Sequence, residues 1–187
     1  MRTREIRGAN VLRHELVVRA EENAHAPADV VYRLLADLPS HHEWAGKRQS
    51  QHAGLRSIDA PEGPARVGTE FRSTGADPMG VFDDRSVVTE AIPGRAFEFV
   101  TEAKLVTKRG RSIFWTNVHR YELQPDTRAC LLRYTLRIAR ISELAGMLVV
   151  FRIPGLRALA VRASAGVAKS GVRNLARLAE EIDGGGR

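Results

Sequence analysis

The sequence predicts an α+β protein: an antiparallel sheet of about seven strands, a long C-terminal helix that covers it, and two short helices after the first strand. Three observations lead to this fold class. Apolar residues alternate with a period of two through much of residues 97–139. Short turns separate these runs, which favours antiparallel hairpins. From residue 156 to 182 the apolar spacing becomes three or four, which indicates a helix.

The composition is that of one globular domain. The chain has 187 residues, 43% hydrophobic and 27% charged, which excludes disorder as its main state. We expect a single domain over residues 1–187, with a core at 14–182, a flexible basic arm at 1–13 and a frayed tail at 183–187. The lone Cys130 excludes an internal disulfide and a cysteine zinc cluster. Because the sequence has neither a long apolar run nor a secretory signal, we expect a cytoplasmic protein.

The first elements are a strand and a helix. Residues 14–24 have β character, and Pro27 suits the first position of the helix that follows. Pro39 stops this helix. Residues 40–46 hold one more helical turn, with Trp44 as its large apolar anchor. The apolar face of the main helix is formed by Val31, Leu34, Leu35 and Leu38.

Strands with one buried face make up the middle of the chain. Residues 92–95, Ile-Pro-Gly-Arg, place proline and glycine where a type II turn needs them. Alternation then predicts strands over residues 97–104, 113–123 and 130–139, the last two joined by a short turn. The inner face of the second strand would carry polar groups among apolar ones, because Asn117 and His119 share the parity of Trp115.

The C-terminal third predicts one long helix with an apolar face and a basic back. Arg162 and Lys169 fall on the side opposite the apolar face, with Arg173 and Arg177 towards its flank. The apolar face is expected to consist of Leu156, Leu159, Ala163, Val167, Gly171, Leu175, Leu178 and Ile182.

Four segments in this order resemble the START-like (SRPBCC, helix-grip) superfamily, and most of all its bacterial polyketide cyclase/dehydrase group. They are residues 26–38 with the nearby Trp44, the glycine-led strand 67–71, the strand–turn–strand 87–100, and the late hairpin 115–138. The resemblance implies a curved sheet that wraps the last helix and leaves a ligand cavity between them. Residues 141–156 depart from the family, since they are more apolar than the usual lead into the last helix.

Motifs for metal, nucleotide or nucleophilic chemistry are missing from the sequence. The neighbouring His41 and His42 would diverge, and Asp83 and Asp84 are expected in a solvated turn. The sequence has no metalloprotease, P-loop, dinucleotide or nucleophile-elbow motif. We therefore expect no metal and no cofactor, and an inert Cys130 on the apolar face of a strand.

A cavity lined by the inner strand faces and the last helix is the predicted ligand site. Its polar members must be hydrogen-bonded, either to one another or to a ligand, and both alternatives stay open here. If the protein is an enzyme, His119 and Tyr134 are the candidates for acid–base groups. The full predicted lining is Trp44, Phe71, Phe97, Phe99, Trp115, Asn117, His119, Tyr121, Tyr134, Leu136, Val167 and Gly171.

Two functions follow from the resemblance. The first is binding or transport of an apolar small molecule, such as a lipid, a sterol or a polyketide-like compound. The alternative is a polyketide cyclase or dehydratase.

The net charge of +7 resides at the ends of the chain, with +3 in residues 1–19 and +5 in residues 137–187, while residues 20–136 carry a net charge of −1. The basic C-terminal helix could make weak contact with an anionic membrane or be a solvated face. Nucleic acid is not expected, because aromatic residues do not alternate with the arginines. The oligomeric state stays open.

Overall fold

The computed structural model describes residues 12, 14–47, 54–77, 79–143, 149 and 153–185. Apart from residue 12, the predicted N-terminal arm lies outside these ranges, as does half of the apolar segment 141–156 that departs from the family. The elements are β1 (Leu16–Ala24), α1 (Ala28–Ala36), the short helices η1 (Leu38–Ser40) and η2 (His42–Lys47), β2 (Gly54–Asp59), β3 (Glu70–Asp77), β4 (Gly80–Ile92), β5 (Ala96–Thr107), β6 (Ser112–Pro125), β7 (Cys130–Ile141) and α2 (Pro154–Gly185).

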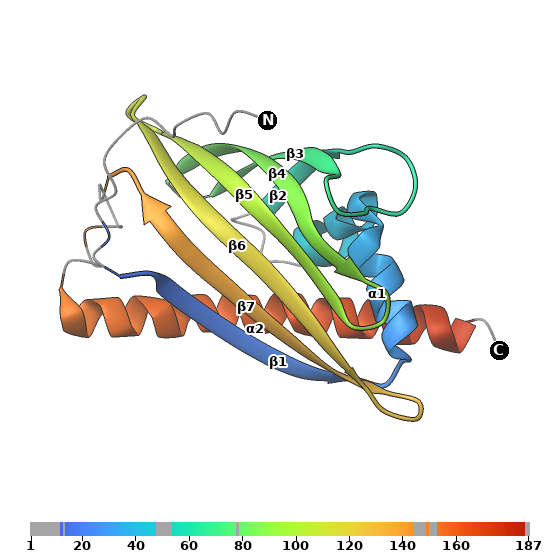
Figure 1. Ribbon diagram of the computed structural model, residues 1–187. Helices are drawn as coiled ribbons and strands as arrows, with labels where there is room; N and C mark the ends of the chain where they lie inside the picture. Colours follow the sequence, from blue (N-terminus) through green and yellow to red (C-terminus); the bar gives the residue numbers. More distant parts are fainter. Residues whose placement is uncertain are drawn as a thin grey trace.

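All seven strands form one antiparallel sheet in the order β1-β7-β6-β5-β4-β3-β2. The sheet curls over α2, which runs along β1 and also contacts α1, η2 and β7 (Figure 1). These features confirm the predicted α+β, helix-grip fold class. The helix α2 continues to Gly185, so residues 183–185 are helical and the prediction of a frayed tail there is wrong.

The turn between β4 and β5 follows its sequence signal. Arg95 donates its backbone N–H to the carbonyl of Ile92 at 3.0 Å, and Gly94 has a φ of 64°. A side chain at Gly94 would overlap the carboxylate of Asp29 in α1. The glycine therefore serves both the left-handed turn position and the close approach of the turn to α1.

The inner face of the sheet carries two apolar clusters. The main cluster joins α1, the C-terminal half of α2 and the near ends of the strands, with Leu35, Phe97 and Leu175 fully buried in it. The second cluster lies at the other end of the strands and includes Leu105 and Ile113. On β6, residues 117–121 lie between the second cluster and the fully buried part of the main cluster.

The helix α2 buries less of its predicted apolar face than the periodicity suggested. Burial on this face begins at Gly171, where α2 meets η2 and α1. Leu156, Leu159 and Val167 are 42%, 64% and 61% exposed, so this part of the predicted apolar face does not join the core. Periodicity reveals the apolar side of a helix, but the neighbouring elements decide how much of that side they cover. None of the described helices is long and apolar enough to cross a membrane.

Candidate functional site

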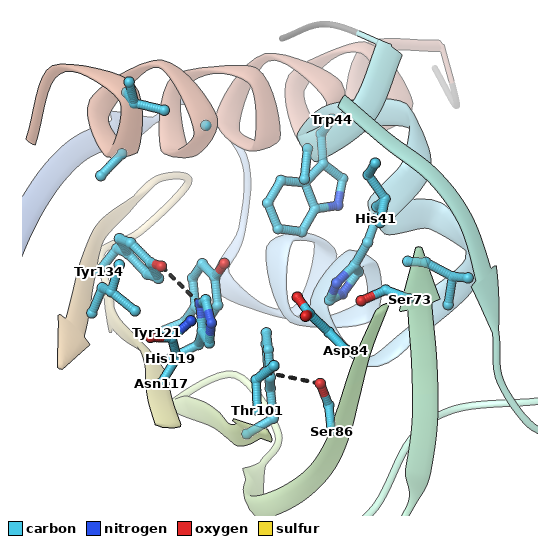
Figure 2. A pocket seen from close by; sticks show the side chains of 18 of the residues that line it. His41, Trp44, Ser73, Asp84, Ser86, Thr101, Asn117, His119, Tyr121 and Tyr134 are labelled. Atoms are coloured by element: carbon cyan, nitrogen blue, oxygen red, sulfur yellow. Dashed lines mark hydrogen bonds between the residues drawn. The ribbon is translucent and has the colours of Figure 1, made fainter. Parts of the chain in front are cut away.

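A cavity of about 510 Å³ lies between the inner face of the sheet, η2 and α2 (Figure 2). Strands β2 to β7 all contribute to its wall, and α2 closes one side through Ser164, Val167, Ala168, Gly171 and Val172. Ten of the twelve predicted ligand-binding residues line it: Trp44, Phe71, Phe99, Asn117, His119, Tyr121, Tyr134, Leu136, Val167 and Gly171. Their role in binding stays a prediction.

The other two predicted residues lie elsewhere on the inner face. Phe97 is completely buried in the main cluster, where its ring meets Tyr32 of α1 edge-on at 6.3 Å. Trp115 packs against the second cluster beyond the end of the cavity. Both have the predicted parity, but their positions along the strands place them outside the lining. Parity fixes the face of a strand and leaves the distance along it open.

Aromatic rings form the centre of the wall. Phe99 stacks on the imidazole of His119 with ring centres 4.6 Å apart and an angle of 12° between the planes. Phe71 meets Phe99 edge-on at 5.3 Å. Tyr121 lies beside Tyr134 with ring centres 4.8 Å apart. Offset and edge-on contacts of this kind fix the ring orientations and leave a broad apolar surface facing the cavity.

The two predicted acid–base residues are hydrogen-bonded to each other. His119 Nδ1 and the Tyr134 hydroxyl are 2.8 Å apart, on strands β6 and β7. Burial lowers the pKa of His119 to about 4, with the nearby His41 as a smaller cause, and burial raises the pKa of Tyr134. The pair is therefore neutral at pH 7. The neutral imidazole of His119 has one N–H and Tyr134 has one O–H, so the pair has two hydrogen-bond donors. One donor is used in the bond between the two residues, and the other is left for other groups.

His41 also lines the cavity. The sequence pattern did not predict this role, because His41 was considered there only as a metal ligand. Its Nε2–H donates to the backbone carbonyl of Leu35 at 2.9 Å, in the last turn of α1. Its ring lies 4.7 Å from that of Trp44. Burial lowers the pKa of His41 to about 4, although the bond to Leu35 acts in the opposite direction. The histidine is thus a neutral C-terminal cap of α1 that also faces the cavity.

Polar side chains from β3, β4 and β5 line the lower edge of the cavity in Figure 2. The hydroxyls of Ser86 and Thr101 share a buried hydrogen bond of 2.8 Å. Asp84 points into the cavity and accepts the backbone N–H of Lys104 at 3.2 Å. Asp83 points to the other face and pairs with Arg72 at 2.6 Å. The expectation of a solvated turn at Asp83 and Asp84 is wrong, because both lie within β4.

Two lining residues carry buried polar atoms that have no hydrogen-bond partner among the described residues: Trp44 Nε1 and Asn117 Oδ1. A buried polar atom without a partner costs about 1–3 kcal/mol. The backbone of Trp44 is held in place, since Asn174 of α2 donates from Nδ2 to its carbonyl at 3.3 Å. Two residues of the cavity wall thus carry one N–H donor and one carbonyl acceptor whose bonding capacity the described residues leave unused.

Other chemistry finds little support within the described ranges. No group of three or more His, Cys, Asp or Glu side chains there could hold a metal ion. Cys130 is a free, buried thiol opposite Ala24 of β1, and burial raises its pKa to about 11. A protonated, inaccessible thiol is unreactive.

Comparisons with known proteins give structural matches only, since no family model and no curated protein sequence matches the chain. A conserved protein from Geobacillus kaustophilus has 14% identity and a TM-score of 0.63, and the match covers 89% of this chain and 96% of that one. The Zhui aromatase/cyclase from a Streptomyces species has 13% identity and a TM-score of 0.60, over 90% and 95% of the two chains. A protein from Chromobacterium violaceum has 14% identity and a TM-score of 0.61, over 88% and 97%. At these identities the likeness shows a common fold.

Proposed function

Starting from the helix-grip fold of the START-like superfamily, which the chain shares with the solved aromatase/cyclase, we propose that the protein binds an apolar small molecule in the cavity. The observation that carries this proposal is the cavity itself: about 510 Å³, walled by aromatic rings and containing a few polar groups. Sites for small molecules in proteins have this size and character. Affinity would come mainly from burial of apolar surface.

The protonation states favour a ligand that is recognised by hydrogen bonds. With pKa values of about 4, His41 and His119 are uncharged at pH 7, and the raised pKa values of Tyr121 and Tyr134 keep both hydroxyls protonated. Trp44 Nε1 could donate to a ligand oxygen and Asn117 Oδ1 could accept from a ligand hydroxyl after a small side-chain rotation. A lipid, a sterol or a polyketide-like compound with such groups satisfies these requirements. We place this binding in the cytoplasm, as expected from the sequence.

Blocking the cavity tests the binding proposal. Ala168 lines the cavity from α2, so Ala168→Trp would fill part of the volume. Ala163 is exposed on the same helix, and Ala163→Trp is the matched control. Native mass spectrometry of the purified proteins should find a bound small molecule in the parent and in the control but not in Ala168→Trp. Equal ligand occupancy in the two variants, with both folded by circular dichroism, would refute binding at this site.

A second candidate function, a cyclase or dehydratase, is favoured by the hydrogen bond between His119 and Tyr134. A general base works best with a pKa near the working pH, and about 4 makes His119 a weak base at pH 7. Binding is therefore the preferred proposal. Tyr134→Phe separates the two, because it removes the hydroxyl and keeps the ring. If that variant retains ligand affinity but loses turnover of a polyketide-like substrate, the protein is an enzyme.

A further inference from the structure

The N-terminal half of α2 presents a row of apolar side chains that the described elements leave uncovered. We call Leu156, Leu159, Ala163 and Val167 the α2 stripe; their spacing of three and four residues places them on one side of the helix. All four are exposed, Leu159 by 64% and Val167 by 61%. The same row continues at Gly171, which is buried. In Figure 1, α1 lies against the C-terminal half of α2 and away from the half that carries the stripe.

The helix that carries the stripe is strongly basic. Residues 154–179 contain five basic side chains, Arg157, Arg162, Lys169, Arg173 and Arg177, and no acidic one. Arg173 is paired with Glu22 of β1 at 3.2 Å, and Arg157 donates to the carbonyl of Glu15 at 3.3 Å. Arg162, Lys169 and Arg177 are exposed and form no ion pair with the described residues. Their charge is therefore available to an anionic partner.

The stripe also adjoins the opening of the cavity. Val167 belongs to the cavity lining and is still 61% exposed, so it lies where the cavity meets the outside. Ser164 and Ala168, its neighbours on α2, line the cavity as well. A surface that covered the stripe would therefore touch this rim.

We propose that the N-terminal half of α2 lies on an anionic lipid surface, with the α2 stripe in the apolar layer and Arg162 and Lys169 at the headgroups. A helix with an exposed apolar row and cations on its polar side is the form that binds membrane interfaces. A second copy of this chain suits the stripe less well, because pairing would bring two sets of unpaired cations together. The role of the cavity opening at the lipid surface rests on the proposed ligand binding. The contact of α2 with the lipid does not depend on it.

Co-sedimentation with vesicles tests this proposal. The full-length protein should bind phosphatidylglycerol vesicles at least tenfold more tightly than phosphatidylcholine vesicles, and 0.5 M salt should weaken the binding, since salt screens the charges. Arg162→Glu should weaken binding by more than about fivefold, the value expected for loss of one interfacial cation. Leu159→Ser should weaken it about tenfold, because a buried leucine is lost from the apolar layer.

Ile182→Ser is the matched control, since Ile182 is a 47% exposed apolar residue of the same helix, about 35 Å from Leu159 at the helical rise of about 1.5 Å per residue. This variant should bind as the parent does. Equal binding to both vesicle types, no binding to either, or equal losses in Leu159→Ser and Ile182→Ser would overturn the proposal. So would a concentration-dependent dimer in sedimentation that Leu159→Ser abolishes. Ligand occupancy, measured by native mass spectrometry without vesicles, reports separately on the proposed function.

Discussion

His41 links the folding stability to pH, and His41→Gln tests that link. The imidazole is only 4% exposed, caps α1 through the carbonyl of Leu35 at 2.9 Å, and packs on Trp44. Its pKa is about 4 in the folded protein. In the unfolded chain the pKa of histidine is about 6.5. As the pH falls below that value, the unfolded state takes up a proton that the folded state does not bind.

The size of the effect follows from the two pKa values. At a pH above about 6.5 the buried, neutral His41 costs the folded state nothing relative to the unfolded state. As the pH falls from about 6.5 to about 4, the free energy of unfolding decreases, because only the unfolded state takes up the proton. The difference of pKa is worth about 3 kcal/mol in the free energy of unfolding, at about 1.4 kcal/mol for each pH unit. His119, whose pKa is also about 4, acts in the same pH range, so part of the loss will remain when His41 is replaced.

Urea unfolding followed by circular dichroism between pH 4 and pH 7.5 measures this difference. The parent should lose about 3 kcal/mol more than His41→Gln over that range. His41→Gln should start from lower stability at pH 7.5, because the contact with Trp44 changes, so the slope against pH is the readout. His42→Gln replaces the neighbouring, half-buried histidine and controls for the substitution itself. Parallel curves for the parent and His41→Gln would refute the reasoning.

Two further predictions concern local geometry. Gly94→Ala should lower the free energy of unfolding by about 2 kcal/mol, because the left-handed φ of 64° is strained for alanine and the Asp29 carboxylate must move away from the new Cβ. Gly110→Ala, with a φ of 77° and open space around it, should cost only about 1 kcal/mol, and equal losses in urea unfolding would contradict this account. Asn174→Ala removes the bond to the Trp44 carbonyl and should cost about 1 kcal/mol. In a Trp115→Phe background Trp44 is the single tryptophan, and Asn174→Ala should shift its fluorescence; an unchanged spectrum would show that Asn174 does not position it.

The sequence predicted the parts of the site that lie on strongly alternating strands. Asn117, His119 and Tyr121 fall on one face because side chains alternate along β6, whatever strand pairs with it. Asp84 was missed because glycine and aspartate around residues 80–84 favour a turn, and only the pairing of β4 with β3 and β5 makes this segment a strand. His41 was missed because its acceptor, the carbonyl of Leu35, is available only once α1 has ended nearby.

For α2 as well, the sequence predicted one part of the arrangement and left another open. The spacing of apolar residues in α2 identified its apolar side, and Gly171 and Leu175 are buried as expected. Leu156 and Leu159 have the same periodicity and are exposed, because coverage depends on where α1 and η2 end. The local sequence of α2 does not determine where those neighbouring helices end.

Cys130 gives the protein a built-in reporter of its own opening. The thiol is 1% exposed at the end of the β1–β7 pairing, and its pKa of about 11 keeps it protonated at neutral pH. A thiol-reactive dye can therefore label the native chain only when this corner of the sheet separates, so the labelling rate measures how often it does so. Because the chain has a single cysteine, the readout needs no substitution, and any molecule that stabilises the folded state should slow it in proportion to its occupancy.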